Sequence, residues 1–276
     1  IIFLGFILQK TIEKKVIIFG TGIHLGRSAR LTIKPAPTNH GIVFKRLDVD
    51  HNNNLIKANF KNILSGELCT TLVNEEGVSV KTVEHLLAAF SGLGISNALI
   101  EIDNEEIPIM DGSAKDFIKV LKRSEIKILN EKRRYLKINN VVELNDGERN
   151  ISISPSNQSF EVTFALNYEN NIIGNQTNTV NFHSDNLEDV YNSRTFCLFE
   201  DIEKIKKIGL AKGGSLDNAI VVDKDKVLNK EGLRNKKEFV NHKILDLAGD
   251  FLLSGYRVLG SVSCKQGGHA LTNKFL

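Results

Sequence analysis

The stretch from Glu238 to Leu253 constrains the fold more than any other, because it places ionisable side chains among the apolar residues of a helix. His242, Asp246 and Asp250 follow one another at intervals of four, so they project along one side of a helix with about 40° of drift per step. The apolar residues share the helical period: Val240, Ile244, Leu247 and Phe251. Buried ionisable groups are costly unless they bind a metal ion or one another. The stretch therefore predicts a buried helix with a functional polar side.

Two interpretations of His242 and Asp246 are open from this helix alone. A neutral imidazole and a carboxylate one turn apart can chelate a divalent cation, for which zinc is the best match. The alternative is a histidine that Asp246 satisfies by a hydrogen bond within an ordinary helix. A ligand from elsewhere in the chain would favour the metal site.

A second helix carries the candidate third ligand. Residues 82 to 94, TVEHLLAAFSGLG, have helical periodicity, with Thr82 as the expected N-cap. Glu84 and His85 stand in the first turn, where the helix dipole favours the carboxylate form of Glu84. If this helix faces residues 238 to 253, His85 completes a set of two histidines and one aspartate, which is typical of a catalytic zinc site with one open position.

The rest of the pattern divides the chain into two similar halves. Alternating or β-branched runs predict strands at 16–19, 29–34, 41–47, 55–60 and 97–103, and then at 135–144, 150–155, 160–166, 179–182 and 257–264. Each half runs strands, helix, strand, helix. The prediction is an α+β fold of two similar domains, each a two-layer sheet-and-helix sandwich, packed with the active site between them.

The domain boundary is predicted from a charged stretch, KRSEIKILNEKRR at residues 122 to 134, which reads as a linker. It gives an N-terminal domain at 1–128 and a C-terminal domain at 129–276. Residues 1–8 are apolar and precede the coherent strand pattern, which starts after Lys14, so we expect an artefactual or disposable extension. The alternatives are a truncated signal segment, an overlong gene start and a small edge strand. Residues 1–8 are too short to span a bilayer, and no stable membrane insertion is expected.

Charge and cysteine usage narrow the class of protein. The formal net charge is +3 over 276 residues, with acids and bases interspersed, so the sequence offers no basic stripe for nucleic acid. Cys69, Cys197 and Cys264 have no paired spacing, which is typical of free thiols in a reducing compartment. Without a credible export signal, we expect a cytoplasmic monomer with no nucleic-acid partner.

Six blocks of sequence carry a resemblance to a known family. They occur in both halves, from about Gln9 to the last residue: KTVEHLLAAFSGLGISNALIEID, EIPIMDGSAKDF, SRTF, GGSLDNAIVV, GLRNKKEFVNHKILDLAGD and GGHALTNK. Together, and in this order, they resemble the UDP-3-O-acyl-N-acetylglucosamine deacetylase family, the zinc amidases of lipid A assembly. The resemblance implies hydrolysis of the acetamide of that UDP sugar, which releases acetate and the free amine in an early committed step of lipid A biosynthesis.

The resemblance also implies roles at the centre of the site. The VEH block makes Glu84 the general base and His85 a zinc ligand. The HKxxD block supplies His242 and Asp246 as the other ligands, with Lys243 between them facing the substrate. The implied cofactor is zinc, and iron could compete with it in the cell.

The remaining blocks imply further catalytic groups. The Thr195 hydroxyl would help to hold the scissile carbonyl oxygen, and Phe196 would lie against the substrate. His269 would be a catalytic imidazole that Asp250 orients. The alternatives are structural roles: Thr195 could be an ordinary strand residue without a catalytic hydroxyl, and His269 could only cap its helix. Either Glu84 or His269 could give a proton to the departing amine, and such an acid and base predict a bell-shaped rate profile.

A weaker part of the resemblance concerns contacts with the acyl chain and the phosphates of a UDP sugar. The candidate substrate-binding residues are Ile202, Lys212, Gly214, Ser215 and Ala219. A solvent-exposed loop is the alternative for Lys212 and the glycines that follow it. The chain departs from the family pattern at Cys197, where glycine is expected, and at Lys212, an uncommon charge.

Two other functions stay open at this point. One is a sugar-nucleotide-binding or regulatory protein that kept the fold and lost turnover. The other is a zinc amidase of the same fold with a different substrate. The presence of both Glu84 and His269 favours an enzyme, and a requirement for the acyl chain would separate the two amidases.

Overall fold

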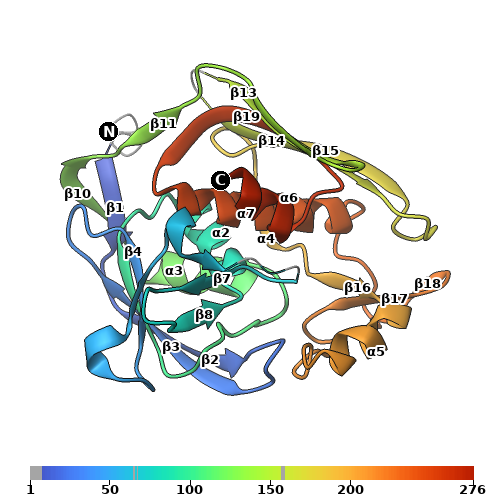
Figure 1. Ribbon diagram of the computed structural model, residues 1–276, viewed down its shortest axis with the longest axis horizontal. Helices are drawn as coiled ribbons and strands as arrows, with labels where there is room; N and C mark the ends of the chain where they lie inside the picture. The colour runs from blue at the N-terminus through green and yellow to red at the C-terminus, as the bar shows by residue number, and fades with distance from the viewer. Residues whose placement is uncertain (1–7, 65, 67, 157–158) are drawn as a thin grey trace.

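The computed structural model describes residues 8–64, 66, 68–156 and 159–276, and it confirms the α+β class. Two large sheets lie on opposite sides of a central layer of helices (Figure 1). Within the described residues, no helix is both long enough and apolar enough to cross a bilayer.

The N-terminal half forms a five-stranded sheet. Its strands, in spatial order, are β2 (Val16–Thr21), β3 (Ser28–Pro35), β9 (Ala98–Ile102), β4 (Ile42–Arg46) and β5 (Leu55–Lys57). Neighbours are antiparallel except β4 and β9, which are parallel. Alternate residues of β3 and β9 turn inward, as Leu31 and Ile100 do. The helices α2 (Glu84–Leu93) and α3 (Lys115–Arg123) cover this apolar face (Figure 1).

The C-terminal half forms a second sheet above the helices. Its path is β12 (Val142–Asp146), β13 (Arg149–Pro155), β19 (Arg257–Lys265), β14 (Phe160–Asn167) and β15 (Asn175–Asn181), and β11 (Tyr135–Lys137) also pairs with β19. The helices α6 (Glu238–Phe251) and α7 (His269–Phe275) lie on its inner face (Figure 1). Phe164 and Val262 point toward them and are buried.

Smaller elements complete the fold around these layers. They are β1 (Leu8–Ile12), β6 (Ile63–Leu64), β7 (Thr71–Val73), β8 (Ser79–Lys81), β10 (Ile126–Lys132), β16 (Phe196–Leu198), β17 (Ile220–Asp223), β18 (Lys226–Val227), α4 (Glu188–Tyr191), α5 (Phe199–Lys207) and the 3-10 turns η1 (His51–Asn53), η2 (Phe60–Asn62) and η3 (Leu252–Ser254). One three-stranded sheet joins β6, β7 and β8, and another joins β16, β17 and β18.

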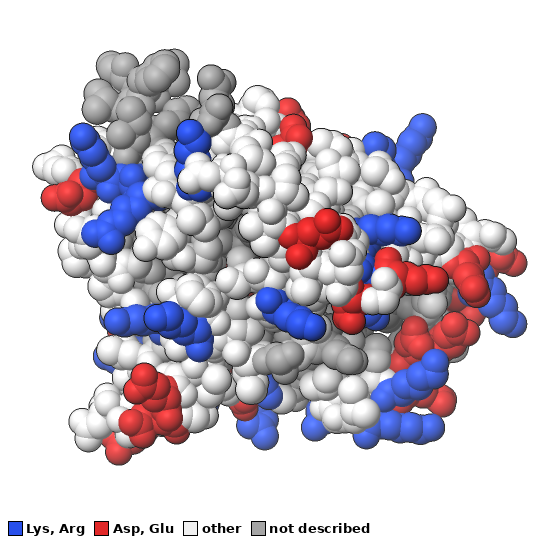
Figure 2. Space-filling model, turned by 45° about the horizontal axis from the view of Figure 1, so that its top comes forward, with Lys and Arg blue, Asp and Glu red and all other residues white. Residues whose placement is uncertain are grey.

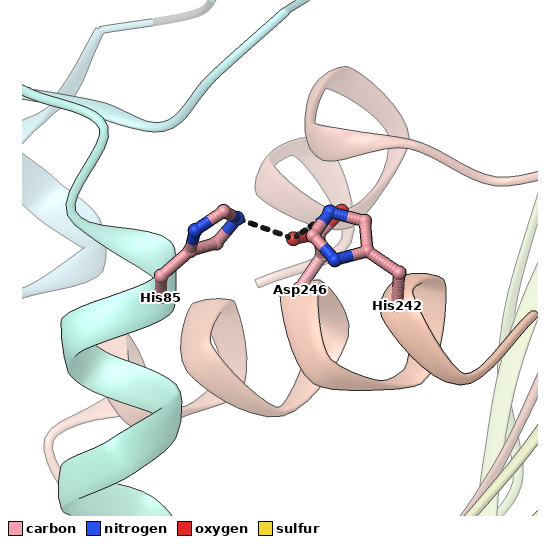
Figure 3. Close-up of side chains that lie close together, drawn as sticks. All are labelled: His85, His242 and Asp246. Carbon is pink, nitrogen blue, oxygen red and sulfur yellow. Dashed lines mark ion pairs between the residues drawn. The ribbon is translucent and has the colours of Figure 1, made fainter. Parts of the chain in front are cut away.

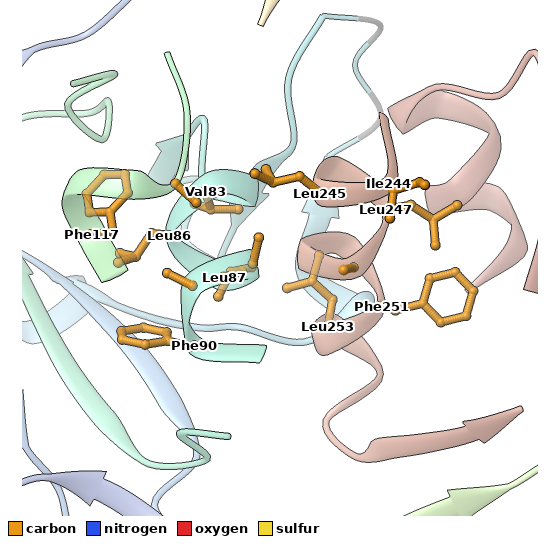
Figure 4. Packing of buried hydrophobic residues seen from close by; sticks show 14 of the residues in the cluster. Val83, Leu86, Leu87, Phe90, Phe117, Ile244, Leu245, Leu247, Phe251 and Leu253 are labelled. Carbon is orange, nitrogen blue, oxygen red and sulfur yellow. The ribbon is translucent and has the colours of Figure 1, made fainter. Parts of the chain in front are cut away.

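Helices α2 and α6 meet at the centre of the molecule, and Figure 4 shows the apolar side chains between and around them. A glycine makes their close approach possible: a Cβ on Gly249 would lie 2.2 Å from the carbonyl oxygen of Glu84. Leu87 and Leu245 are fully buried in the same contact. Because the backbones touch, the polar residues that begin α2 face those on the middle of α6.

Three local predictions were wrong. The predicted linker at 122 to 134 contains β10, which pairs antiparallel with β1, so the strand pattern begins before Lys14. The predicted strand at 135–144 is two strands, β11 and β12, in different pairings. Residues 1–7 of the predicted extension lie outside the described residues. The division at 128 falls within β10 and stays a prediction.

The expected N-cap of α2 was also wrong. The helix begins at Glu84, and Thr82 precedes it with a positive φ of 58°. The Thr82 hydroxyl donates to Glu106 Oε1 at 3.1 Å instead of capping the helix. The helix ends at Gly94, in the left-handed conformation that glycine adopts readily.

Candidate metal centre

Helices α2 and α6 bring the three predicted ligands together. Figure 3 shows His85 on α2 facing His242 and Asp246 on α6. His85 Nε2 lies 3.4 Å from Asp246 Oδ1, and His242 Nε2 lies 3.3 Å from the same oxygen. One ligand atom from each residue lies within 4.8 Å of the other two. The three residues can therefore coordinate a single cation.

The geometry of this cluster fits a metal better than it fits hydrogen bonds. Four ligands at about 2.0 to 2.1 Å around a tetrahedral ion lie about 3.3 Å from one another, close to the two distances above. Asp246 Oδ1 and His85 Nδ1 are buried, and neither has a hydrogen-bond partner in the described part of the chain. Such orphaned polar atoms are costly unless an ion or a ligand compensates them. The interpretation of His242 as a histidine that Asp246 merely satisfies is therefore disfavoured.

The protonation states also suit a metal. Burial, with smaller effects from His85 and Lys243, lowers the pKa of His242 to about 3 against the opposing effect of Asp246. Burial alone would raise the pKa of Asp246, but His242 and Lys243 outweigh it and hold that pKa well below its usual value. The His242 Nδ1 atom lies 3.1 Å from the backbone oxygen of Ser193. This contact orients the ring with Nε2 toward the cluster.

A second network adjoins the ligands. His269, the first residue of α7, places Nε2 3.5 Å from Glu84 Oε1 and 3.8 Å from Asp246 Oδ2. Its Nδ1 lies 2.8 Å from Asp250 Oδ2. The Thr70 hydroxyl donates to Asp250 Oδ1 at 2.6 Å, and the Thr70 N–H donates to Glu84 Oε2 at 3.1 Å. The network thus holds a carboxylate and an imidazole side by side at the metal cluster.

The protein environment raises the pKa values of Glu84 and His269. Burial raises the pKa of Glu84, and it outweighs the opposing effects of His269 and His85. The dipole effect expected at the start of α2 is therefore not the dominant one. Burial would lower the pKa of His269, but Asp250 and Glu84 overcome it and raise that pKa to about 10. His269 is accordingly a cation near neutral pH.

The two residues expected to face the substrate lie beside His242. The Phe196 ring centroid is 6.4 Å from that of His242, and the Lys243 ammonium lies 5.6 Å from the Phe196 centroid. Lys243 Nζ also lies 3.3 Å from Asp246 Oδ2. Thr195 comes directly before β16, and its backbone N–H donates to the Gly112 carbonyl at 2.8 Å. Thr195 lies two residues after Ser193, whose backbone oxygen contacts His242 Nδ1.

The other candidate substrate residues lie farther from the metal cluster. Ile202 is half-buried on α5, at the side of the β16 to β18 sheet (Figure 1). Ser215 is exposed, and its hydroxyl accepts from the Asp217 N–H within a turn. Ala219 is buried before β17. The role of these three residues in a substrate passage stays a prediction.

The loop with Lys212 and Gly214 docks on the turn between β2 and β3. The backbone N–H of Lys212 donates to the His24 carbonyl at 3.1 Å. The Lys212 side chain is exposed, and so is Gly214. Cys197 is half-buried in β16, where its thiol adds bulk to the strand that carries Phe196.

Three residues of the site were missed from the sequence. Thr70 bridges Asp250 and Glu84, and nothing in the surrounding CTT sequence marks it. Ser193 contributes only a backbone oxygen. His24 is buried, its Nδ1 has no hydrogen-bond partner among the described residues, and burial lowers its pKa, with smaller lowering effects from His269 and His85. A histidine in the glycine-containing segment GTGIHLG was the only available signal.

A buried cluster of two histidines and one aspartate, next to a carboxylate and an imidazolium and between two sheet-and-helix layers, defines the class of a metal-centred α+β hydrolase. Comparison with known sequences gives the particular family. A family model for UDP-3-O-acyl N-acetylglycosamine deacetylase matches residues 9–276. The chain belongs to this family.

Named relatives agree along nearly the whole chain. The UDP-3-O-acyl-N-acetylglucosamine deacetylase of Idiomarina loihiensis is 40% identical over 273 residues, which cover 98% of this chain and 89% of the relative. The proteins of the same name from Actinobacillus pleuropneumoniae serotype 3 and Shewanella oneidensis are 38% and 41% identical, with the same coverage of both chains.

Proposed function

We propose that this protein hydrolyses the acetamide of UDP-3-O-acyl-N-acetylglucosamine and releases acetate and the free amine. The observation that carries the proposal is the convergence of His85, His242 and Asp246 with Glu84 and His269 in one buried cluster. Membership of the deacetylase family supports the choice of substrate. This reaction is an early committed step of lipid A biosynthesis.

His85, His242 and Asp246 would hold the metal, which we propose to be zinc. Two imidazoles and one carboxylate form a ligand set that zinc favours, and iron is a competitor for the same donors. When bound, such an ion polarises a carbonyl group and makes water more acidic. The coordination leaves Glu84 and His269 free for proton transfer.

Glu84 is placed to act as the general base. Its Oε2 accepts from the Thr70 N–H, which leaves Oε1 directed toward His269 and the metal cluster. Burial raises its pKa, so the carboxylate is a stronger base than an exposed one, which suits a general base. We propose that it takes the proton of the attacking water.

His269 and Thr195 would stabilise the oxyanion that forms on the acetamide carbon. His269 is held as an imidazolium by Asp250 and Glu84, and charged donors of this kind stabilise developing negative charge. The Thr195 hydroxyl would add a second donor. The proton for the departing amine would then come from Glu84 or His269, which both lie at the cluster.

Phe196 and Lys243 would contact the substrate beside the metal. They contact each other, and Phe196 also contacts His242 while Lys243 contacts Asp246. Ile202, Lys212, Gly214, Ser215 and Ala219 would line its longer acyl and nucleotide parts. The protein is proposed to act as a cytoplasmic monomer, because its substrate is a soluble sugar nucleotide and its cysteines are free.

The proposal is tested by removing and restoring the metal. Chelation should abolish acetate release from the acylated UDP sugar, and added zinc should restore it. UDP-N-acetylglucosamine, which lacks the acyl chain, serves as the matched control substrate and should be hydrolysed far more slowly. Full activity after exhaustive chelation would refute the metal role, and equal rates on the two substrates would refute the proposed substrate.

A further inference from the structure

A cavity of about 420 Å³ lies at the end of α2 opposite the metal cluster. Phe90, Ser91 and Gly94 at the end of α2 form one wall, and Ala248, Phe251 and Leu252 at the end of α6 form another. Four basic residues also line it: Lys57, Arg133, Arg134 and Arg257. Among the described residues that line it there is no aspartate or glutamate. Figure 2 shows basic side chains gathered on the side of the molecule where β1 and β10 lie in Figure 1.

Two of these guanidinium groups meet over a single α-carbon. A Cβ on Gly94 would lie 3.2 Å from Arg133 Nη1 and 3.4 Å from Arg257 Nη1. Arg133 Nη2 donates to the Gly94 carbonyl. The Arg133 Nε atom is buried, and no described residue forms a hydrogen bond with it. A guanidinium has five N–H donors, so the cap on α2 leaves most of the capacity of Arg133 unused.

The cationic charge here is not neutralised by its surroundings. Burial and the neighbouring Arg257 together lower the pKa of Arg133 to about 10. Burial lowers the pKa of Lys10 as well, with added effects from both arginines. Arg257 Nε lies 3.0 Å from His183 Nε2, and burial lowers the pKa of His183 to about 4. That imidazole is therefore neutral and supplies no counter-charge.

A purely structural pair of arginines would be arranged differently. Arg194 shows the contrast: it is fully buried, and it donates to Glu238, Glu231 and the Gly232 carbonyl. Arg133 and Arg257 have no such carboxylate partner within the residues that the structure describes, although each is partly withdrawn from water. Unpaired cations in a concave site are the arrangement expected where a ligand brings the negative charge.

We propose that this cavity binds an organic phosphate monoester, with the phosphate on Arg133 and Arg257 and an apolar body on the floor of the cavity. Phosphate is favoured because guanidinium groups bind its oxygens in pairs and because a dianion matches several convergent cations. The floor includes Phe90, Phe251 and Val258. The volume lies within the range of small-molecule sites.

The test measures stabilisation of the full-length, metal-loaded protein by phenyl phosphate in a buffer without phosphate. A ligand that binds only the folded state raises the unfolding temperature. Inorganic phosphate is the second probe, and the aromatic ester should half-saturate the shift at a lower concentration. Equal half-saturation by the two probes would overturn the organic part of the proposal.

Variants assign the shift to this cavity. R133Q and R257Q should each weaken the affinity for phenyl phosphate by about tenfold or more, which is the usual effect of losing a charge-assisted hydrogen bond. S91F keeps every cation but fills the cavity from α2, and it should weaken binding similarly. R149Q, on an exposed residue of β13, is the matched control and should bind like the original protein. Unchanged binding in R133Q, R257Q and S91F would overturn the proposal.

Discussion

The two ends of helix α2 hold buried charge of opposite sign. At its start, the carboxylates of Glu84, Asp246 and Asp250 outnumber the nearby cations, which are the His269 imidazolium and the Lys243 ammonium. At its end, Arg133 and Arg257 meet without an acidic partner among the lining residues. The first end has an excess of negative charge that a metal cation would balance, and the second has an excess of positive charge that an anion would balance.

The two ends of α2 differ in how firmly hydrogen bonds fix their charged side chains. At the start of α2, Thr70 joins Glu84 to Asp250, and Asp250 joins His269, so the acid and base are fixed by short hydrogen bonds. At the end of α2, one arginine donates to the Gly94 carbonyl and the other contacts a neutral imidazole. Preorganised groups are what catalysis requires, whereas a binding site can tolerate more adjustment.

The largest effect should follow from E84Q. This change removes the base but keeps the shape of the side chain, so turnover should fall by about 10² to 10⁴, while metal content stays the same. Acetate release and elemental analysis measure the two quantities. E75Q, at an exposed position, is the matched control. If metal content fell together with the rate, Glu84 would have a structural role instead.

The next effect should follow from D250N. Asp250 is the main group that raises the pKa of His269, so its loss lets burial lower that pKa. The rate should fall by at least about tenfold. The alkaline limb of the pH profile, which follows loss of the His269 proton, should move to lower pH. The acidic limb, which follows protonation of Glu84, should stay above the ordinary carboxylate range.

The pH dependence of kcat for the original protein and for D225N, an exposed control, provides the comparison. An alkaline limb at the same pH in D250N would assign that limb to a group other than His269. A flat profile from pH 5 to 9 in the original protein would remove both assignments.

The start of α2 was largely predictable from the sequence, and its end was not. His242 and Asp246 belong to one helical period, and His85 stands in a second apolar helix, so residue chemistry and spacing indicated a shared site. Thr70 could not be found, because its contacts with Glu84 and Asp250 depend on the packing of three separate segments. Arg133 and Arg257 are far apart in the sequence, and neither belongs to a pattern that signals the other.

Contacts between distant segments also explain the errors in the predicted fold. β10 is charged and half-exposed, so its composition resembled a linker, and only the pairing with β1 makes it a strand. Thr82 had the composition of an N-cap, but its hydroxyl is engaged by Glu106. Local propensity is overridden where a distant segment supplies the hydrogen bonds.

A smaller effect should follow from G249A, which tests whether the two ends depend on the same helix contact. The added methyl group would meet the Glu84 carbonyl, so the helices must separate, at a cost of about 1 to 3 kcal/mol in the free energy of unfolding. Metal affinity should also fall, because Glu84 and His85 move with α2. Chemical denaturation and metal titration measure these effects.

The control for G249A is G268A, where an added Cβ meets no atom within 4 Å and φ is −160°. This variant should unfold like the original protein. Full metal affinity in a destabilised G249A would show that the ligand geometry does not depend on the close approach of α2 and α6.

The smallest effect should follow from R257Q in the absence of any added anion. The change removes repulsion between Arg257 and its neighbours Arg133 and Lys10, which offsets the loss of its contact with His183, so the free energy of unfolding should stay within about 0.5 kcal/mol of the original value or rise slightly. R194Q is the informative contrast, because it leaves Glu238 buried without its cation and should cost about 3 to 5 kcal/mol. Urea denaturation at low salt measures both. A loss in R257Q that approached the loss in R194Q would mean that Arg257 stabilises the fold, and the contrast between the two ends of α2 would then disappear.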